Sequence, residues 1–320
     1  MRVIVIREFG GPEVMKVETV GDLKPGAGEV LVRVHAAGVN PLDAYRRAGA
    51  HSYRPPLPHT PGNDGAGVVE ALGAGVSGLS LGQRVYVNAS LSGTYAERTL
   101  CTREAVQPLP KSLSFAQGAC VGIPYGTAYR ALFQRAKAQS GELVLVHGAS
   151  GGVGLAAVQL ARASGMRVAG TAGTPRGMDL VLREGAHAAF DHTTADYERE
   201  LFEWTGKKGF DVIVEVLANV NLAKDLRLAA RYGRVAVLGS RGSIEIDPRE
   251  TMTRDVSILG LSLRNATPEE RPRIDAALNA GLEDGALKPV VGRELALAEA
   301  PEAHRAVLAS GAFGKIVLLP

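Results

Sequence analysis

One short stretch of the chain concentrates glycine where a backbone could approach a phosphate closely. Gly148, Gly151, Gly152 and Gly154 fall within the eight residues HGASGGVG. The motif follows a β-branched apolar run and opens an alanine-rich stretch with helical spacing, which is the setting of a dinucleotide-binding turn. There the glycines permit a tight turn, and free N–H groups at the helix N-terminus bind the pyrophosphate. A tight turn without a ligand is the alternative, whereas a P-loop is excluded because no Lys-Ser/Thr pair follows.

The next predicted strand indicates which dinucleotide fits. Sites for NAD place Asp or Glu about 20 residues beyond the glycines, to bind the ribose 2′-OH. This strand instead ends Thr-Ala-Gly-Thr-Pro-Arg over residues 171–176. Gly173 and Thr174 leave room for a 2′-phosphate, and Arg176 could meet it with charge-assisted hydrogen bonds. Arg176 could also be an ordinary solvated residue at a helix start, so the missing carboxylate is the stronger sign that the cofactor is NADPH.

Other reactive residue types are sparse in these 320 residues. Cys101 and Cys120 are too few for a disulfide scaffold or a cysteine-rich zinc site, and they predict a reduced, cytoplasmic setting. Neither has a visible His partner, so we expect both to pack. Lys and Arg number 36 against 33 Asp and Glu, a net charge of +3, without the concentrated basic patch of a nucleic-acid binder.

Elements that alternate between strand and helix must position the glycine motif. The middle of the chain predicts α/β structure, a doubly wound parallel sheet covered by helices on both faces. The apolar stretch 143–161 belongs to this pattern, because its glycines divide it into a strand, a turn and a helix. The six expected strands are Leu143–His147, Arg167–Thr171, Ala188–Asp191, Asp211–Val216, Arg234–Leu238 and Ser257–Leu261. The expected helices between them are Gly154–Ser164, Arg176–Glu184, Tyr197–Thr205 and Leu222–Ala230.

The first third of the chain predicts a separate β domain. Short strands at Arg2–Arg7, Glu29–Ala36, Gly67–Leu72 and Arg84–Asn88 are separated by Gly, Pro and Asn clusters. The C-terminal stretch has two helical patterns, Arg271–Asp284 and Pro301–Ser310, and a last strand, Lys315–Leu319, with no sheet of its own. We therefore expect residues 1–123 and 265–320 to form one domain and residues 124–264 to form the dinucleotide-binding domain.

Several motifs together resemble the medium-chain dehydrogenase/reductase superfamily, and within it the zinc-free, zeta-crystallin-like quinone oxidoreductases. The motifs are the glycine-rich run 148–154, Val39-Asn40-Pro41 with Tyr45, Thr60-Pro61-Gly62-Asn63-Asp64 and Leu238-Gly239-Ser240-Arg241-Gly242. The resemblance covers nearly the whole chain. It implies a six-stranded Rossmann domain and a GroES-like β-barrel domain, with the cofactor bound between them and a homodimer or homotetramer as the assembly.

The same comparison predicts that no metal is bound. Zinc-dependent relatives have Cys at the position of Asn40 and Gly-His-Glu at positions 62–64, where this chain has Gly-Asn-Asp. Asn is a poor zinc ligand, and His59 has no partners at ligand spacing. Without a Lewis acid to polarise an alcohol or aldehyde, the expected substrate is a quinone or a conjugated enone.

The resemblance also implies the site residues, position by position. Asn40, Tyr45 and Thr127 would line the nicotinamide and substrate side and are the catalytic candidates, although a half-buried tyrosine or a capping hydrogen bond would explain them too. The cofactor-binding candidates are Tyr45, Ser150, Gly151, Gly152, Val153, Gly173, Arg176, His192, Asn221, Leu238, Gly239, Ser240, Arg241, Leu261, Ser262 and Leu263.

Three functions stay open at this point. The first is reduction of quinones by NADPH, through hydride or single-electron transfer. The second is an NADPH-dependent reductase of enones or enoyl thioesters on the same scaffold. The third is a structural, lens-crystallin-like or RNA-binding protein that retains NADPH, which the low aromatic content of 5% and the charge of +3 support poorly.

Overall fold

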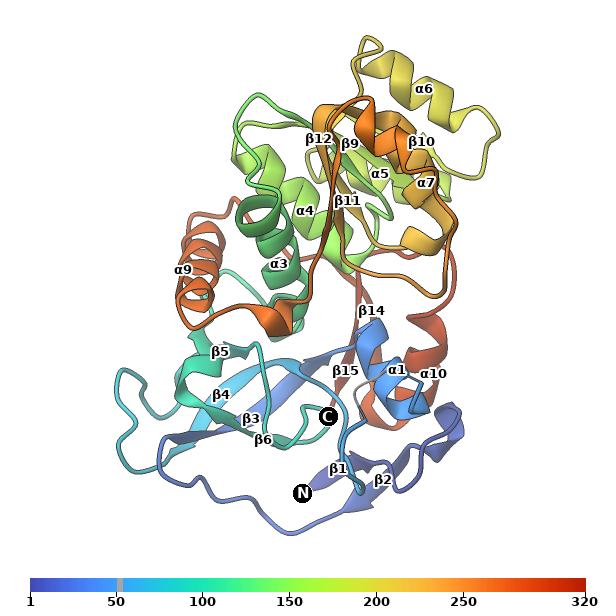
Figure 1. Ribbon diagram of the computed structural model, residues 1–320. Helices are drawn as coiled ribbons and strands as arrows, with labels where there is room; N and C mark the ends of the chain where they lie inside the picture. Colours follow the sequence, from blue (N-terminus) through green and yellow to red (C-terminus); the bar gives the residue numbers. More distant parts are fainter. Residues whose placement is uncertain (51–53) are drawn as a thin grey trace. The chain divides into compact units, whose positions relative to one another are not determined.

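The computed structural model describes residues 1–50 and 54–320, which divide into two compact units. Unit 1 consists of Met1–Ile123, Pro289–Ser310 and Gly314–Pro320. Unit 2 consists of Pro124–Lys288 together with the short segment Gly311–Phe313. Figure 1 follows the chain through both units, from blue at the N-terminus to red at the C-terminus.

Unit 2 is built on a six-stranded parallel sheet in the order β10-β9-β8-β11-β12-β13, which confirms the predicted Rossmann sheet. Its central strands are short β-branched runs that are almost completely buried, because helices α4 to α7 pack against them (Figure 1). The strand order reverses between β8 and β11, the point where open α/β sheets bind their ligands. The strands are β8 (Leu143–Val146), β9 (Arg167–Ala172), β10 (Ala188–Asp191), β11 (Phe210–Glu215), β12 (Ala229–Val237) and β13 (Ser257–Gly260). The helices are α4 (Gly152–Ala163), α5 (Pro175–Arg183), α6 (Tyr197–Trp204) and α7 (Ala218–Leu228); the short α8 (Arg249–Met252) precedes β13.

The expected domain boundary after residue 264 differs from the structure. Residues up to Lys288 lie in unit 2, including α9 (Glu270–Glu283). Helix α9 buries Ile274, Leu278 and Leu282 in this unit. Arg130, in the π-helical turn Arg130–Arg135 that continues α3 (Gly122–Tyr129), binds the Glu270 carboxylate and donates to the Asn265 carbonyl at 3.2 Å. These contacts hold α9 to unit 2 although no strand of that sheet follows it.

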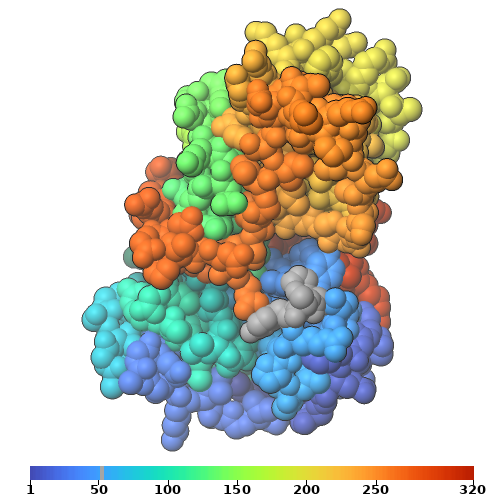
Figure 2. Space-filling model, in the orientation of Figure 1, coloured from blue at the N-terminus to red at the C-terminus, as the bar shows by residue number. Residues whose placement is uncertain are grey.

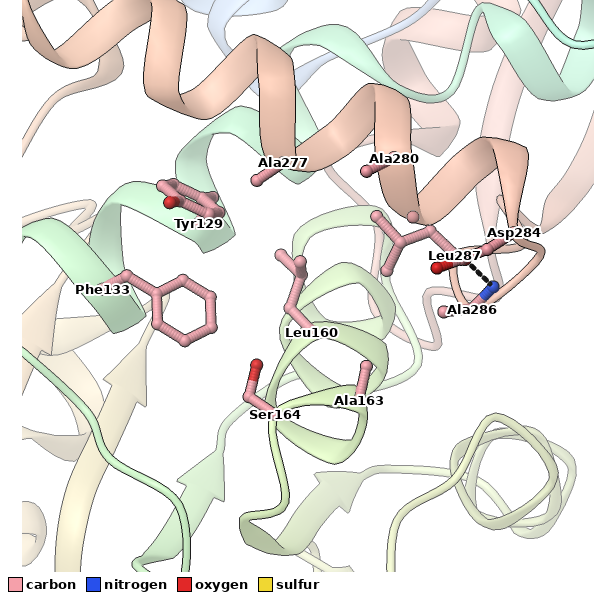
Figure 3. Close-up of a pocket in the computed structure, with 11 residues that line it drawn as sticks. Tyr129, Phe133, Leu160, Ala163, Ser164, Ala277, Ala280, Asp284, Ala286 and Leu287 are labelled. Atoms are coloured by element: carbon pink, nitrogen blue, oxygen red, sulfur yellow. Dashed lines mark hydrogen bonds between the residues drawn. The ribbon is translucent and has the colours of Figure 1, made fainter.

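A cavity of about 390 Å³ lies between α9, α4 and the π-helical turn. Figure 3 shows Phe133 and Leu160 pointing toward it from different elements, with Ala277 and Ala280 above them on α9. The cavity exists because α9 presents the small residues Ala277, Ala280 and Gly281 here, whose side chains are too short to fill the space. The cavity contains none of the predicted site residues.

Unit 1 is built on a seven-stranded sheet in which the long strand β3 (Glu29–Gly38) is central. Antiparallel β4 (Asp64–Leu72) lies beside β3, and β5 (Arg84–Val87) and β7 (Val106–Pro108) follow outward. On the other side β15 (Lys315–Leu319) pairs with β3 and carries β14 (Val291–Ala296) at the edge, so the last strand joins the first domain as predicted. The remaining strands are β6 (Arg98–Thr102), which also pairs with β3, and the separate pair β1 (Arg2–Val5) and β2 (Lys16–Thr19).

In the described part of unit 1, the α-helices are α1 (Pro41–Ala48), α2 (Phe115–Gly118) and α10 (Ala300–Ala306). Helix α1 was not among the predicted elements, although Pro41 opens it and Gly49 ends it with a left-handed φ of 64°. Among the described residues, no helix combines the length and hydrophobicity that a bilayer crossing requires. The apolar stretch 143–161 is divided between β8 and α4, as its glycines predicted.

Candidate functional site

The glycine motif forms a tight turn between β8 and α4, hereafter the phosphate loop (residues 148–154). Gly148 has a left-handed φ of 58°, and a Cβ atom on Gly154 would lie only 2.3 Å from the Gly148 carbonyl oxygen. Helix α4 can therefore approach the end of β8 only because position 154 has no side chain. The sequence prediction of a strand, a turn and a helix at this point is confirmed.

The N-terminus of α4 is suited to an anion. Its N-cap residue is Gly151, and no side chain in the described part of the chain caps the helix. The first N–H groups of a helix have no partner within it, and they carry the positive end of the helix dipole. Ser150 lies beside them, with its hydroxyl donating to the Ala312 carbonyl at 2.7 Å. The predicted residues Ser150, Gly151, Gly152 and Val153 thus surround one uncapped helix end.

The end of β9 brings together the residues predicted for the adenosine side. A Cβ atom on Gly173 would lie 2.9 Å from Nε2 of His192, so these two positions are neighbours. Partial burial, followed by the charge of nearby His147, lowers the pKa of His192, which makes a neutral imidazole the favoured form. The Arg176 guanidinium lies over the ring of Phe313, 3.8 Å from its centroid.

The loops after β11 and β12 are joined by backbone hydrogen bonds. Ala218 N–H donates to the Gly239 carbonyl at 2.9 Å, and Arg241 N–H donates to Oδ1 of Asn219 at 2.8 Å. A Cβ atom at position 239 would lie 2.6 Å from the Val216 carbonyl oxygen, so a glycine is needed for this approach. These bonds place Leu238, Gly239, Ser240 and Arg241 beside the start of α7, the helix that carries Asn221.

The remaining unit 2 candidates, Leu261, Ser262, Leu263 and Thr127, lie in two adjacent segments. Leu261 N–H donates to the Val237 carbonyl at 3.1 Å, which continues the pairing of β12 and β13. A Cβ atom on Gly126 would lie 3.0 Å from the Leu263 side chain, so α3 passes directly beside this segment. Thr127 follows Gly126 on α3 and is partly buried. The structure thus brings Thr127 near the segment 261–263.

Below the phosphate loop lies a buried cluster that the sequence analysis missed. Nε2 of His147 donates to Oδ1 of Asp225 at 2.9 Å and lies 3.8 Å from Oε2 of Glu215. The other imidazole nitrogen lies 3.2 Å from the Thr171 hydroxyl oxygen. Oε1 of Glu215 accepts from the Leu217 N–H and, at 3.4 Å, from Asn221, which connects the cluster to a predicted cofactor residue. A lone glutamate within the apolar strand pattern of β11 was the available sequence signal.

The pKa values of Glu215 and His147 are both raised in this cluster. Burial, opposed by His147 and reinforced by the negative charge of Asp225, raises the pKa of Glu215 to about 7. Burial alone would lower the pKa of His147, but the neighbouring Asp225 and Glu215 carboxylates outweigh it and raise that pKa. Oε2 of Glu215 and Oδ2 of Asp225 find no hydrogen-bond donor among the described residues.

Unit 1 contains a second buried polar centre. Asp64, fully buried at the start of β4, accepts from the Asn40 side chain at 2.9 Å and from the Ile123 N–H at 2.8 Å. The Lys315 ammonium lies 3.3 Å from the same carboxylate and donates to the Asn40 side-chain oxygen. Asn40 is thus held by two partners at the N-terminus of α1, the helix on which Tyr45 lies partly buried.

This centre does not fit a zinc ion. The zinc-motif positions hold Asn40 and Asp64, and the cation between them is the Lys315 ammonium. Asn63 instead donates to Asp43 at 3.3 Å. Both cysteine thiols are buried, and burial raises the pKa of each to about 12. Over residues 1–50 and 54–320, only His147, Glu215 and Asp225 gather three potential ligand atoms, and they lie in unit 2.

Two family models match the chain. The Alcohol dehydrogenase GroES-like domain matches residues 26–137, and the Zinc-binding dehydrogenase domain matches residues 152–279. The second match contains none of the zinc-motif positions compared above. Both matches agree with the expected fold class, a GroES-like domain together with a Rossmann domain.

Known proteins resemble the whole chain. Human quinone oxidoreductase is 50% identical over 321 residues, covering 100% of this chain and 98% of that protein. A structure titled NAD-dependent alcohol dehydrogenase has a TM-score of 0.92 and 33% identity, with full coverage of both chains. Escherichia coli quinone oxidoreductase, solved in complex with NADPH, has a TM-score of 0.89 and 27% identity, again with full coverage of both chains.

Proposed function

Because the chain belongs to the quinone oxidoreductases of the medium-chain dehydrogenase/reductase superfamily, we propose that it reduces quinones with electrons from NADPH. The observation that carries the cofactor assignment is the uncapped N-terminus of α4, built on a loop in which Gly154 contacts Gly148. The observation that carries the substrate class is the 50% identity over the full chain to human quinone oxidoreductase.

The described residues fit a bound NADPH. Ser150, Gly151, Gly152 and Val153 would hold the pyrophosphate at the N-terminus of α4. Gly173, Arg176 and His192 would hold the adenosine 2′-phosphate, with no carboxylate in residues 171–176 to repel it. The nicotinamide half would meet the candidates that remain: Tyr45, Asn221, Leu238, Gly239, Ser240, Arg241, Leu261, Ser262 and Leu263. When bound, NADPH supplies the hydride or single electrons.

The protein's own contribution is then binding and orientation. Thr127, Asn40 and Tyr45 are the side chains that we assign to the quinone side. Both polar atoms of the Asn40 side chain already have buried partners, so Asn40 acts as a fixed part of the surface rather than as a proton donor. Tyr45 is the candidate for donating a proton, and the oxygens of a reduced quinone can also take protons from water.

Steady-state kinetics test the proposal directly. NADPH and NADH are compared as reductants of an ortho-quinone, a simple enone and, in the reverse direction, an alcohol. We expect NADPH-dependent reduction of the quinone that survives a chelator. Turnover of the enone alone would favour the alternative enone or enoyl-thioester reductase. Alcohol oxidation that a chelator abolishes would overturn the zinc-free assignment, and a preference for NADH would overturn the role of Arg176.

The assembly is a separate prediction. Strand β13 is the edge of the parallel sheet, and Ile258 on it is 39% exposed. Residues around this strand form part of the orange surface in Figure 2. An edge strand with unpaired backbone groups and an exposed apolar side chain supports pairing with a second copy, hence a homodimer or homotetramer. Sedimentation of the purified protein tests this expectation.

A further inference from the structure

The Lys315 ammonium is buried in unit 1 and surrounded by oxygen atoms. Its side chain is 4% exposed, and its Nζ donates to the Val39 carbonyl at 3.0 Å and to the side-chain oxygen of Asn40. Oδ2 of Asp64 lies 3.3 Å away. The contacts with Val39 and Asn40 are hydrogen bonds, and the contact with Asp64 is an ion pair. The ammonium is therefore enclosed by oxygen atoms of the protein.

Two glycines leave the space that this arrangement needs. A Cβ atom on Gly38 would lie 2.9 Å from Cε of Lys315 and 2.1 Å from the Ala119 carbonyl oxygen. A Cβ atom on Gly122 would lie 2.5 Å from Oδ1 of Asp64. A side chain at position 38 or 122 would displace the Lys315 or Asp64 side chain, so the ion pair requires glycine at both positions.

Stability alone is a weak reason for such a pair. Removing two charges from water is costly in free energy, and well-packed apolar residues often replace a buried ion pair without loss of stability. The ion pair instead orients a neighbouring side chain. Lys315 can only donate to the oxygen of the Asn40 amide, and the Asp64 carboxylate can only accept from its NH₂ group. The amide of Asn40 therefore has one permitted orientation.

We propose that Lys315 is a positioning residue whose ammonium lies between the side chains of Asn40 and Asp64 and fixes the orientation of the Asn40 amide. It orients the side chain of Asn40 and, through that residue, the N-terminus of α1, the helix that carries Tyr45. Asn40 N–H also donates to Asp43 on α1 at 2.9 Å, which extends the same network into the helix. The effect on catalysis rests on the proposed function, which places Asn40 and Tyr45 on the quinone side.

The test uses a charge-neutral double variant. Lys315→Met alone leaves the Asp64 carboxylate buried without its cation and could prevent folding. Lys315→Met/Asp64→Asn removes both charges and keeps an acceptor for the Ile123 N–H. Lys111→Met is the matched control, because Lys111 is an exposed lysine of unit 1. All proteins are compared by thermal unfolding, by NADPH titration and by quinone kinetics.

We expect the double variant to bind NADPH with at most a few-fold loss, because most of the proposed cofactor contacts, the phosphate loop among them, lie in unit 2 and only Tyr45 lies on α1. We expect its KM for the quinone to rise, or its kcat to fall, at least tenfold, while Lys111→Met is unchanged. A double variant that folds and reduces quinone like the wild type would overturn the proposal.

A second readout does not depend on activity. In protein labelled with ¹⁵N-asparagine, the side-chain amide of Asn40, assigned by its loss in Asn40→Ala, should exchange slowly with solvent. We expect that protection to be lost in the double variant and kept in Lys111→Met. Protection that persists without Lys315 would contradict the positioning role. If the wild type reduces no quinone, the proposed function fails, whereas the amide measurement still decides whether the Lys315–Asp64 pair fixes Asn40.

Discussion

The guanidinium of Arg176 lies over the aromatic ring of Phe313, 3.8 Å from its centroid, although 137 positions separate the two residues in the sequence. Phe313 belongs to the segment Gly311–Phe313, which joins unit 2 late in the chain. The same segment receives the Ser150 hydroxyl at the Ala312 carbonyl. One short segment thus contacts both the pyrophosphate and the 2′-phosphate sides of the predicted cofactor site.

Removing the Arg176 side chain should reduce the preference for NADPH. In Arg176→Ala we expect kcat/KM for NADPH to fall about 10- to 100-fold, the effect of losing a charged hydrogen bond of about 1.5–3 kcal/mol. The value for NADH should stay within about twofold, because NADH lacks the 2′-phosphate. An equal loss with both cofactors would mean that Arg176 has another role.

Replacing Phe313 should have a smaller effect of the same kind. An exposed cation–π contact contributes about 0.5–1 kcal/mol, so Phe313→Leu should lower the NADPH-to-NADH ratio about two- to fivefold. Phe313→Tyr, which keeps an aromatic face, is the control. In an Arg176→Ala background the effect of Phe313→Leu should vanish. If it persists there, the ring does not act through Arg176.

The phosphate loop should not tolerate a methyl group at position 154. In Gly154→Ala the added Cβ would lie 2.3 Å from the Gly148 carbonyl oxygen and 2.6 Å from Cα of Ala149, so backbone must move. Overpacking of this kind costs about 1–3 kcal/mol. We expect a lower melting temperature and at least tenfold weaker NADPH binding. Gly21→Ala, where no atom lies within 4 Å of the added Cβ, should match the wild type in both measurements.

The buried Glu215 should make stability depend on pH. Its pKa is raised from 4.5 to about 7 in the folded protein, so between these values the folded state holds a proton that the unfolded state has lost. The free energy of unfolding therefore falls as the pH rises from about 4.5 to 7, and the raised pKa of His147 acts in the same direction. Glu215→Gln imitates the protonated form and should flatten this decline.

Urea unfolding at pH 5 and pH 8 measures the effect. We expect Glu215→Gln to be more stable than the wild type at pH 8 by up to about 3 kcal/mol, the size of a pKa shift from 4.5 to about 7. The exposed residue Glu203 gives the control, Glu203→Gln, which should retain the wild-type decline. If the free energy of unfolding of Glu215→Gln falls with pH as steeply as that of the wild type, other groups cause the pH dependence.

Both cysteines should be inert in the folded protein. Cys101 and Cys120 are 0% and 2% exposed, and burial raises the pKa of each thiol to about 12. Thiolate is the reactive form, so a disulfide reagent such as DTNB should detect almost no thiol before denaturant is added and both afterwards. Rapid labelling of the native protein, with loss of activity, would contradict the expected packing role.

The sequence by itself determined those features that depend on neighbouring residues. The alternation of apolar runs and helical stretches predicted all six strands of unit 2, because a parallel strand buried on both faces needs a continuous apolar run. The phosphate loop was predictable for the same reason. The close contact between Gly148 and Gly154 involves residues that are near each other in the sequence, so the spacing of the glycines predicts it.

The tertiary structure decided the features that join distant parts of the chain. Asn40 and Lys315 are 275 positions apart, and nothing near Lys315 in the sequence indicates that its ammonium meets Asn40 and Asp64. The contact exists because β15 pairs with β3, which brings the last strand beside the end of an early one. Helix α9 has the same explanation, since its apolar pattern predicted a helix but not that this helix packs in unit 2. Pairing between strands and the choice of a packing partner depend on the whole folded chain, and local residue patterns do not encode them.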